Sequence, residues 1–165
     1  MNKVSEYIDS FTLIGLTTRT SNAAERNPAT AKIGGMMQHY WGKQVAKAFN
    51  GRRQPGVTFA AYTDYESDEH GNYTYFIGEV VETLCLQDLS QFQTLTLPAS
   101  HYLKFTPDRA TMPAVVIQAW QAIWQMTPTD LQGTRTYQTD FEIYDERAED
   151  PQAATLDIYL GIAPS

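Results

Sequence analysis

Apolar residues in the first half of the chain follow strand-like and helix-like spacings in turn. The segment 7–16 mixes β-branched and aromatic residues, which favours a first strand, and the polar segment 17–27 is expected to be a loop. Apolar positions recur every three or four residues over 33–49, which predicts an amphipathic helix. Two strand-like runs at 57–65 and 73–81 flank a turn-rich segment, and together they predict a β-hairpin.

The second half of the chain repeats this order of elements. Strand-like segments at 92–97 and 101–105 precede a predicted helix at 112–126. A second predicted hairpin follows, with strands at 136–144 and 155–162 on either side of an acidic loop. The order strand-helix-strand-strand therefore occurs twice.

Aromatic residues recur at a fixed offset between the two halves. Trp41 and Trp120, which both lie in predicted helices, are 79 residues apart. Tyr65 and Tyr144, which lie at the ends of the strands that follow, have the same spacing. This offset favours an internal repeat of one structural unit.

Such a repeat predicts an α+β fold built from two duplicated β-α-β-β modules. The expected limits are about 6–84 for the first module and 90–163 for the second, within a single domain of residues 1–165. The modules are expected to form an antiparallel sheet with one helix each. Their pseudo-twofold junction is the expected position of a ligand cleft.

The charge balance narrows the classes of partner. The chain carries 12 Lys and Arg against 19 Asp and Glu, and its net charge of −7 opposes a phosphate backbone at long range. We therefore expect no direct nucleic-acid binding, and a cation is a better candidate partner than an anion. The sequence has no signal-peptide pattern and no apolar run of about 20 residues, so we expect a cytoplasmic protein without a membrane partner.

The residues that usually hold metals or perform nucleophilic catalysis are few and scattered. His39, His70 and His101 follow one another at intervals of 31 residues, and none has a second histidine at ligand spacing. Cys85 is the only cysteine, so neither an intramolecular disulfide nor a multi-cysteine metal site can form. The sequence has no phosphate-loop, dinucleotide or Gly-x-Ser-x-Gly motif. We therefore expect no cofactor and no metal, and we assign no catalytic residue.

Several segments of the second half resemble one family by their order. A proline-containing turn and aromatic strand at 94–105 precede the helix with Trp120 and Trp124, and the strand sequence Asp140-Phe141-Glu142-Ile143-Tyr144 and the segment 156–162 follow. In this order they resemble the GyrI-like, or AraC-type, effector-binding family, and they are similar to its stand-alone members on integron cassettes that bind cationic drugs. The resemblance implies the duplicated fold described above and a ligand-binding function.

Glu142 is the residue to which this resemblance gives the main role. Strand alternation places Glu142 and Tyr144 on one face, and Phe141 and Ile143 on the other. A strand glutamate is commonly solvated, but the matching glutamate in multidrug-binding relatives is a buried anchor for cationic ligands. A carboxylate among aromatic residues has a desolvation cost that an entering cation offsets. Each aromatic face adds a cation–π attraction of roughly 0.5–2 kcal/mol.

The walls of this site are expected to be aromatic. We rank Tyr62, Trp120, Trp124, Tyr144 and Tyr159 highest as ligand-binding residues. The two tryptophans are four positions apart on one helical face, Tyr144 shares the face of Glu142, and Tyr159 lies on the adjacent hairpin strand. At least half of all aromatic candidates are expected to belong to the core, and the remaining candidates are Tyr40, Trp41, Phe59, Tyr75 and Phe92.

The sequence therefore predicts a small-molecule effector-binding protein that takes up amphipathic organic cations in a transcriptional or drug response. A transcriptional role requires a partner protein that carries a DNA-binding domain. Two alternatives stay open: a hydrolase of electrophilic small molecules, and a protein-interaction module like the gyrase-inhibiting relatives. The hydrolase would use Glu142 with a second carboxylate such as Glu79, for which a solvated or strand-edge role near the end of its strand is expected over a catalytic one. We favour a binding module over an enzyme.

Overall fold

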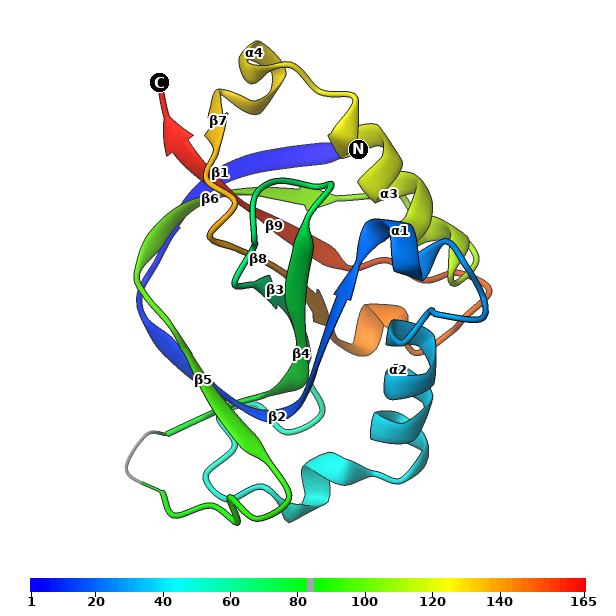
Figure 1. The fold of residues 1–165 in the computed structure, drawn as a ribbon, viewed down its shortest axis with the longest axis vertical. Coiled ribbons are helices and arrows are strands. Elements are labelled where there is room, and N and C mark those ends of the chain that lie inside the picture. The colour runs from blue at the N-terminus through cyan, green and yellow to red at the C-terminus, as the bar shows by residue number, and fades with distance from the viewer. Residues whose placement is uncertain (83–84) are drawn as a thin grey trace.

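One large antiparallel sheet and two main helices make up the architecture of this chain (Figure 1). The computed structural model describes residues 1–82 and 85–165. The elements in chain order are β1 (Asn2–Ile8), β2 (Phe11–Ser21), α1 (Asn22–Glu25), α2 (Ile33–Gly42), η1 (Val45–Ala48), β3 (Thr58–Thr63), β4 (Asn72–Val81), β5 (Gln93–Leu97), β6 (Ser100–Thr106), α3 (Ala114–Trp124), α4 (Pro128–Leu131), β7 (Gly133–Arg135), β8 (Thr139–Tyr144), η2 (Glu146–Ala148) and β9 (Asp157–Pro164).

The strand order β1-β6-β9-β8-β3-β4-β2-β5 is symmetric about its centre, and β7 is added beside β9. β1 and β5 form the edges, β2 and β6 lie next to them, β4 and β9 follow, and β3 pairs with β8 in the middle. The chain thus has the expected α+β fold of duplicated β-α-β-β units. Because β1 pairs with β6 and β5 pairs with β2, each half also lends one edge strand to the other.

Three boundaries differ from those that the sequence predicts. Part of the polar segment 17–27 is a strand, because β4 pairs with β2 as far as Ser21. β1 is a separate strand with mostly exposed side chains, and an exposed edge strand needs no apolar alternation. The first long helix ends at Gly42 because Gln44 adopts a left-handed conformation (φ 51°), and the 3-10 turn that follows places Phe49 in the core.

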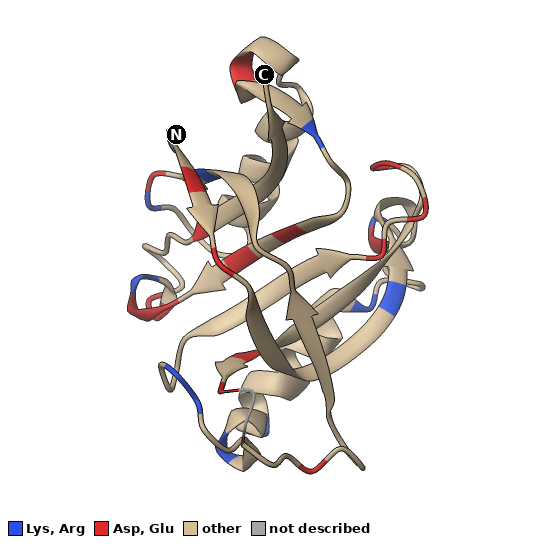
Figure 2. Ribbon diagram, turned by 90° about the vertical axis from the view of Figure 1, so that its left-hand side faces the viewer, with Lys and Arg blue, Asp and Glu red and all other residues tan. Residues whose placement is uncertain are grey.

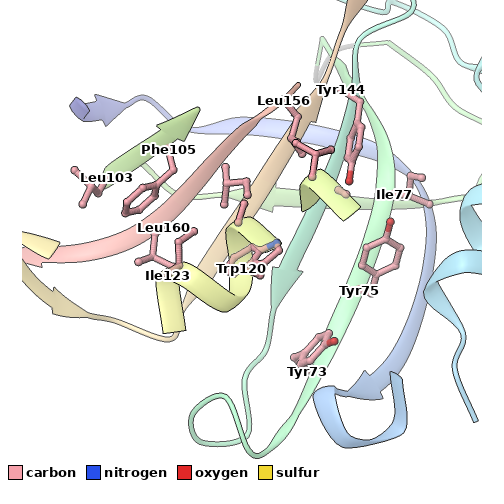
Figure 3. Packing of buried hydrophobic residues seen from close by; sticks show 14 of the residues in the cluster. Tyr73, Tyr75, Ile77, Leu103, Phe105, Trp120, Ile123, Tyr144, Leu156 and Leu160 are labelled. Carbon is pink, nitrogen blue, oxygen red and sulfur yellow. The ribbon is translucent and has the colours of Figure 1, made fainter. Parts of the chain in front are cut away.

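Each face of the sheet buries its own hydrophobic cluster. Both α2 and α3 cover one face, where Ile77, Phe105 and Leu156 are fully or almost fully buried (Figures 1 and 3). On the other face the sheet curls on itself. Phe11 of β2 packs against Phe141 of β8 with 5.4 Å between ring centroids, although β3 and β4 lie between these strands. In the part of the chain that the structure describes, no helix is long and apolar enough to cross a membrane.

The two main helices cover their face unequally. α3 buries Val115, Ala119, Trp120 and Ile123 against the sheet, whereas α2 fully buries only Tyr40. The looser packing of α2 leaves space beside the central strands, and the cleft described next occupies it.

Candidate functional site

A cleft of about 1120 Å³ lies between α2 and α3 and is lined by residues of the central strands β3 and β8. This volume exceeds the usual range of roughly 300–1000 Å³ for small-molecule sites, so a bulky organic ligand fits. Apolar side chains such as Met37, Met112, Val116 and Ile117 contribute to its walls. The aromatic lining residues are Trp41, Tyr62, Tyr65, Tyr73, Trp120, Trp124 and Tyr144.

Glu142 of β8 lines this cleft as a fully buried carboxylate, with 0% of its surface exposed. Its Oε2 accepts hydrogen bonds from Trp120 Nε1 at 2.6 Å and from the Tyr62 hydroxyl at 3.0 Å. Its Oε1 accepts a hydrogen bond from the Tyr144 hydroxyl at 2.8 Å. The indole nitrogen of Trp120 and the hydroxyl oxygen of Tyr144 point toward the same space (Figure 3). Aromatic residues from three elements therefore orient this carboxylate.

The charge of Glu142 has no ion-pair partner among residues 1–82 and 85–165. Burial raises the pKa of its carboxyl above the usual value, while the hydrogen bonds from Trp120, Tyr144 and Tyr62 act in the opposite direction. Burial and the nearby Glu142 also raise the pKa of both tyrosine hydroxyls, Tyr62 and Tyr144, well above 10. The two hydroxyls therefore stay protonated and donate to the carboxylate without neutralising it.

Two other charged side chains of the cleft lining have counterions. Asp145 forms an ion pair with Arg147 at 2.9 Å, and Arg135 forms one with Asp140 at 2.8 Å. Acidic positions are spread over strands and loops of the whole chain (Figure 2). Glu142 differs from the acidic groups of these pairs because it is buried without a counterion, so a ligand cation can supply the missing charge.

Four of the five predicted aromatic residues lie in the cleft. Tyr62, Trp120 and Tyr144 surround Glu142, as their hydrogen bonds show. Trp124 also lines the cleft, but it is 38% exposed, and its ring centroid lies 6.4 Å from that of Trp120. Trp124 therefore belongs to the rim and not to the buried floor.

The fifth predicted aromatic residue, Tyr159, lies on the opposite face of the sheet. The register of β8 and β9 places Ile158 opposite Glu142, and Tyr159 opposite Phe141. The ring of Tyr159 stacks on that of Phe141, with 4.5 Å between centroids. The expectation that Tyr159 lines the cleft is wrong. That β8 and β9 are adjacent does not determine which of their residues pair, and a shift of this register by one residue moves the side chains of a strand to the other face of the sheet.

Trp41, a lower-ranked aromatic candidate of the sequence analysis, is a wall of the cleft. Its indole Nε1 donates to Thr58 Oγ1 at 3.0 Å, and its ring packs edge-on against Tyr144 with 5.5 Å between centroids. Trp41 is the residue that matches Trp120 at the 79-residue offset, so the repeat itself contained this signal. The first half of the fold thus contributes Trp41 to the cleft, and the second half contributes Trp120 and Trp124.

Glu79 is buried, so the solvated role, one of the two expected for it, is wrong. β2 pairs with β4 as far as Val81, whereas β3 pairs with it only as far as Gly78, and the Glu79 side chain is nevertheless buried. Glu79 Oε2 lies 3.5 Å from Arg52 Nη1 and accepts a hydrogen bond from the Gly56 amide at 3.3 Å. Burial raises the pKa of Glu79. Glu79 is absent from the cleft lining, so it does not form a carboxylate pair with Glu142 there.

Asp140 is a second buried carboxylate on β8 that the ranking did not include. It accepts hydrogen bonds from the Tyr65 hydroxyl at 2.6 Å, from Arg135 Nη2 at 2.8 Å and from the Gly161 amide at 2.8 Å. Its position two residues before Glu142, on the same strand face, was the signal available in the sequence. Within residues 1–82 and 85–165, no three His, Cys, Asp or Glu side chains gather in an arrangement that can hold a metal ion.

Comparisons with known proteins agree with this architecture. A putative transcriptional regulator, YobU of Bacillus subtilis (strain 168), is 30% identical over 158 residues, which cover 94% of both chains. An integron cassette protein from the mobile metagenome of Vibrio cholerae has a similar structure, with a TM-score of 0.74, 28% identity, and coverage of 98% of this chain and 95% of that one.

A further similar structure is that of SAV2435 bound to tetraphenylphosphonium. Its TM-score is 0.76 at 18% identity, and the match covers 99% of this chain and 94% of that one. At this identity the match concerns the fold. The family model of Cass2, the integron-associated effector-binding protein, matches residues 6–162. From the fold, the cleft and these matches it follows that the chain belongs to the family of integron-associated effector-binding proteins.

Proposed function

We propose that this effector-binding protein takes up amphipathic organic cations, with Glu142 as the anchor in the aromatic cleft. The observation that carries this proposal is the fully buried carboxylate of Glu142, which lines a large aromatic cleft and has no counterion in the described residues. The ligand-binding residues in this proposal are Glu142, Tyr62, Trp120, Trp124 and Tyr144.

The energetics of the site favour a cation over a neutral or anionic ligand. Burying a carboxylate without a counterion costs several kcal/mol even after local hydrogen bonds, and an entering positive charge offsets part of that cost. The faces of Trp41, Trp120 and Trp124 in the lining add cation–π attraction. Aromatic and methionine side chains also adapt to ligands of different shape, which supports uptake of several related cations.

Similarity to SAV2435 supports the same class of ligand, because that protein carries tetraphenylphosphonium, a bulky organic cation, on this fold. The relation to a putative transcriptional regulator supports a role in a transcriptional or drug response. With a net charge of −7, the chain is proposed to act without direct DNA contact, through a cytoplasmic partner protein that carries a DNA-binding domain.

Titration with a fluorescent cationic dye, such as rhodamine 6G, tests this proposal. We expect saturable one-to-one binding with a Kd in the micromolar range and displacement of the dye by tetraphenylphosphonium. Quenching of tryptophan fluorescence is expected to follow the same curve, because three tryptophans line the cleft. Absence of saturable binding for both cations would contradict the proposed function.

Cation binding is expected to weaken at acidic pH. Only the ionised form of Glu142 offers a charge, so the affinity falls as the pH drops through its pKa and approaches a tenfold loss per pH unit below it. Burial raises this pKa, so the decline begins at a higher pH than for an ordinary glutamate. Dye titrations between pH 8 and pH 4.5, with circular dichroism as a check on folding, measure this effect. An affinity independent of pH over this range would argue against an ionisable anchor.

A further inference from the structure

Arg135 lines the cleft and has hydrogen-bond donors without an acceptor in the part of the chain that the structure describes. Its side chain is 10% exposed, and its guanidinium carbon lies 4.2 Å from the centroid of the Tyr137 ring. A guanidinium has five N–H donors. Within residues 1–82 and 85–165, its one hydrogen bond runs from Nη2 to Asp140, and the buried Nε–H has no acceptor. The buried Nε–H is closed to a ligand, but Nη1 is not among the buried atoms and has no acceptor in the described residues, so a ligand atom in the cleft can accept from it.

Arg135 can be placed relative to Glu142 because its ion-pair partner, Asp140, lies on the same strand as Glu142, namely β8. Asp140, which pairs with Arg135, and Glu142 are two residues apart on β8 and therefore share the cleft face. At 3.3–3.4 Å per residue, their backbone positions are roughly 7 Å apart along the strand. Tyr62 connects the two positions, because it lies opposite Asp140 in β3 and donates to Glu142.

The surrounding charges determine which kind of acceptor fits. Asp140 already balances the charge of Arg135, and its oxygens are occupied by Tyr65, Arg135 and Gly161. A ligand anion at this end of the cleft would meet the negative charges of both Asp140 and Glu142. A neutral oxygen, in contrast, can accept from the free N–H groups without adding charge.

We propose that Arg135 forms an acceptor subsite, which binds a neutral oxygen of the ligand, such as a ketone or ester carbonyl. The Arg135 guanidinium lies 2.8 Å from the carboxylate of Asp140, whose backbone position is roughly 7 Å along β8 from that of Glu142, and we take this step as the separation of subsite and anchor. The inference rests on the proposed function, because the distance is measured from the positively charged group of the ligand, which Glu142 is proposed to bind. It narrows the ligand class to organic cations that carry an oxygen acceptor at that separation.

Two matched probes test this subsite by isothermal titration. The first is 4-acetylbenzyl-trimethylammonium, and the second carries an isopropyl group of similar shape in place of the acetyl group. A hydrogen bond from a charged donor makes the acetyl probe bind about tenfold more tightly to the native chain. In Arg135→Lys, a cation remains beside Asp140 but the planar set of donors is lost, so the ratio of the two Kd values falls to about one.

The results of this experiment distinguish a failure of the Arg135 subsite from a failure of Glu142 as the anchor. Equal affinity of both probes for the native chain, or an acetyl preference that survives in Arg135→Lys, would overturn the subsite and leave the role of Glu142 intact. Failure of both probes and of tetraphenylphosphonium to bind would contradict the proposed function itself. Tighter binding of a 4-carboxybenzyl probe would overturn the neutral acceptor in favour of an anion. If Arg135→Lys does not fold, the double variant Arg135→Gln with Asp140→Asn removes both charges together, and the same loss of ratio is expected.

Discussion

Replacement of Glu142 by Gln is expected to weaken tetraphenylphosphonium binding by roughly 30-fold or more, because the ligand loses its counter-charge in a buried site. The amide oxygen of Gln still accepts from Trp120 and Tyr62, and its NH₂ group donates to the Tyr144 hydroxyl, which can turn to accept. We therefore expect the variant to fold. Isothermal titration of the native and variant chains measures the loss.

The matched control is Glu82→Gln, which changes the net charge by the same amount. Its side chain is 60% exposed and pairs with Arg53 at the surface, outside the cleft. We expect the control to bind tetraphenylphosphonium as the native chain does. An equal loss in both variants would mean that the overall charge of the chain attracts the cation, and unchanged affinity in Glu142→Gln would remove Glu142 as the anchor.

Asp140→Ala is expected to lower the free energy of unfolding by about 3–5 kcal/mol, because it leaves the buried Arg135 without its counterion. The Tyr65 hydroxyl and the Gly161 amide lose their acceptor at the same time. Urea denaturation followed by circular dichroism measures this loss. The effect concerns stability, and it is separate from the loss of affinity in Glu142→Gln.

Asp9→Ala is the control for this second prediction, because Asp9 is exposed between β1 and β2. Its unfolding free energy is expected to stay within about 0.5 kcal/mol of the native value. A loss of less than 1 kcal/mol in Asp140→Ala would show that the three hydrogen bonds to this carboxylate do not stabilise the fold as described.

Most of the fold could be predicted from the sequence where runs of β-branched and aromatic residues end at turns, or where apolar residues recur at helical spacing. The two hairpins and α3 follow such patterns, and the symmetric strand order agrees with the repeated element order. β1 and the end of β2 could not be predicted this way. The side chains of β1 are largely solvent-exposed and those at the end of β2 are polar and mostly half-buried, and partner strands that are distant in sequence hold both segments in the sheet.

The residues of the candidate site, too, could be predicted only in part. Glu142 and Tyr144 could be placed together because they are two residues apart on one strand, where alternation determines the face. Tyr159 was assigned to the wrong face because the loop between β8 and β9 sets their register, and the loop residues do not encode it in a simple pattern. The Arg135–Asp140 pair was missed because an ion pair between β7 and β8 depends on the path of the connecting turn.

Paired titrations with tetraphenylphosphonium and tetraphenylborate test the central claim most directly, because the two ions share shape and size and differ in the sign of charge. A buried, unpaired Glu142 predicts micromolar binding of the phosphonium and at least tenfold weaker binding of the borate. Equal affinities, or tighter binding of the borate, would contradict a cleft that selects cations.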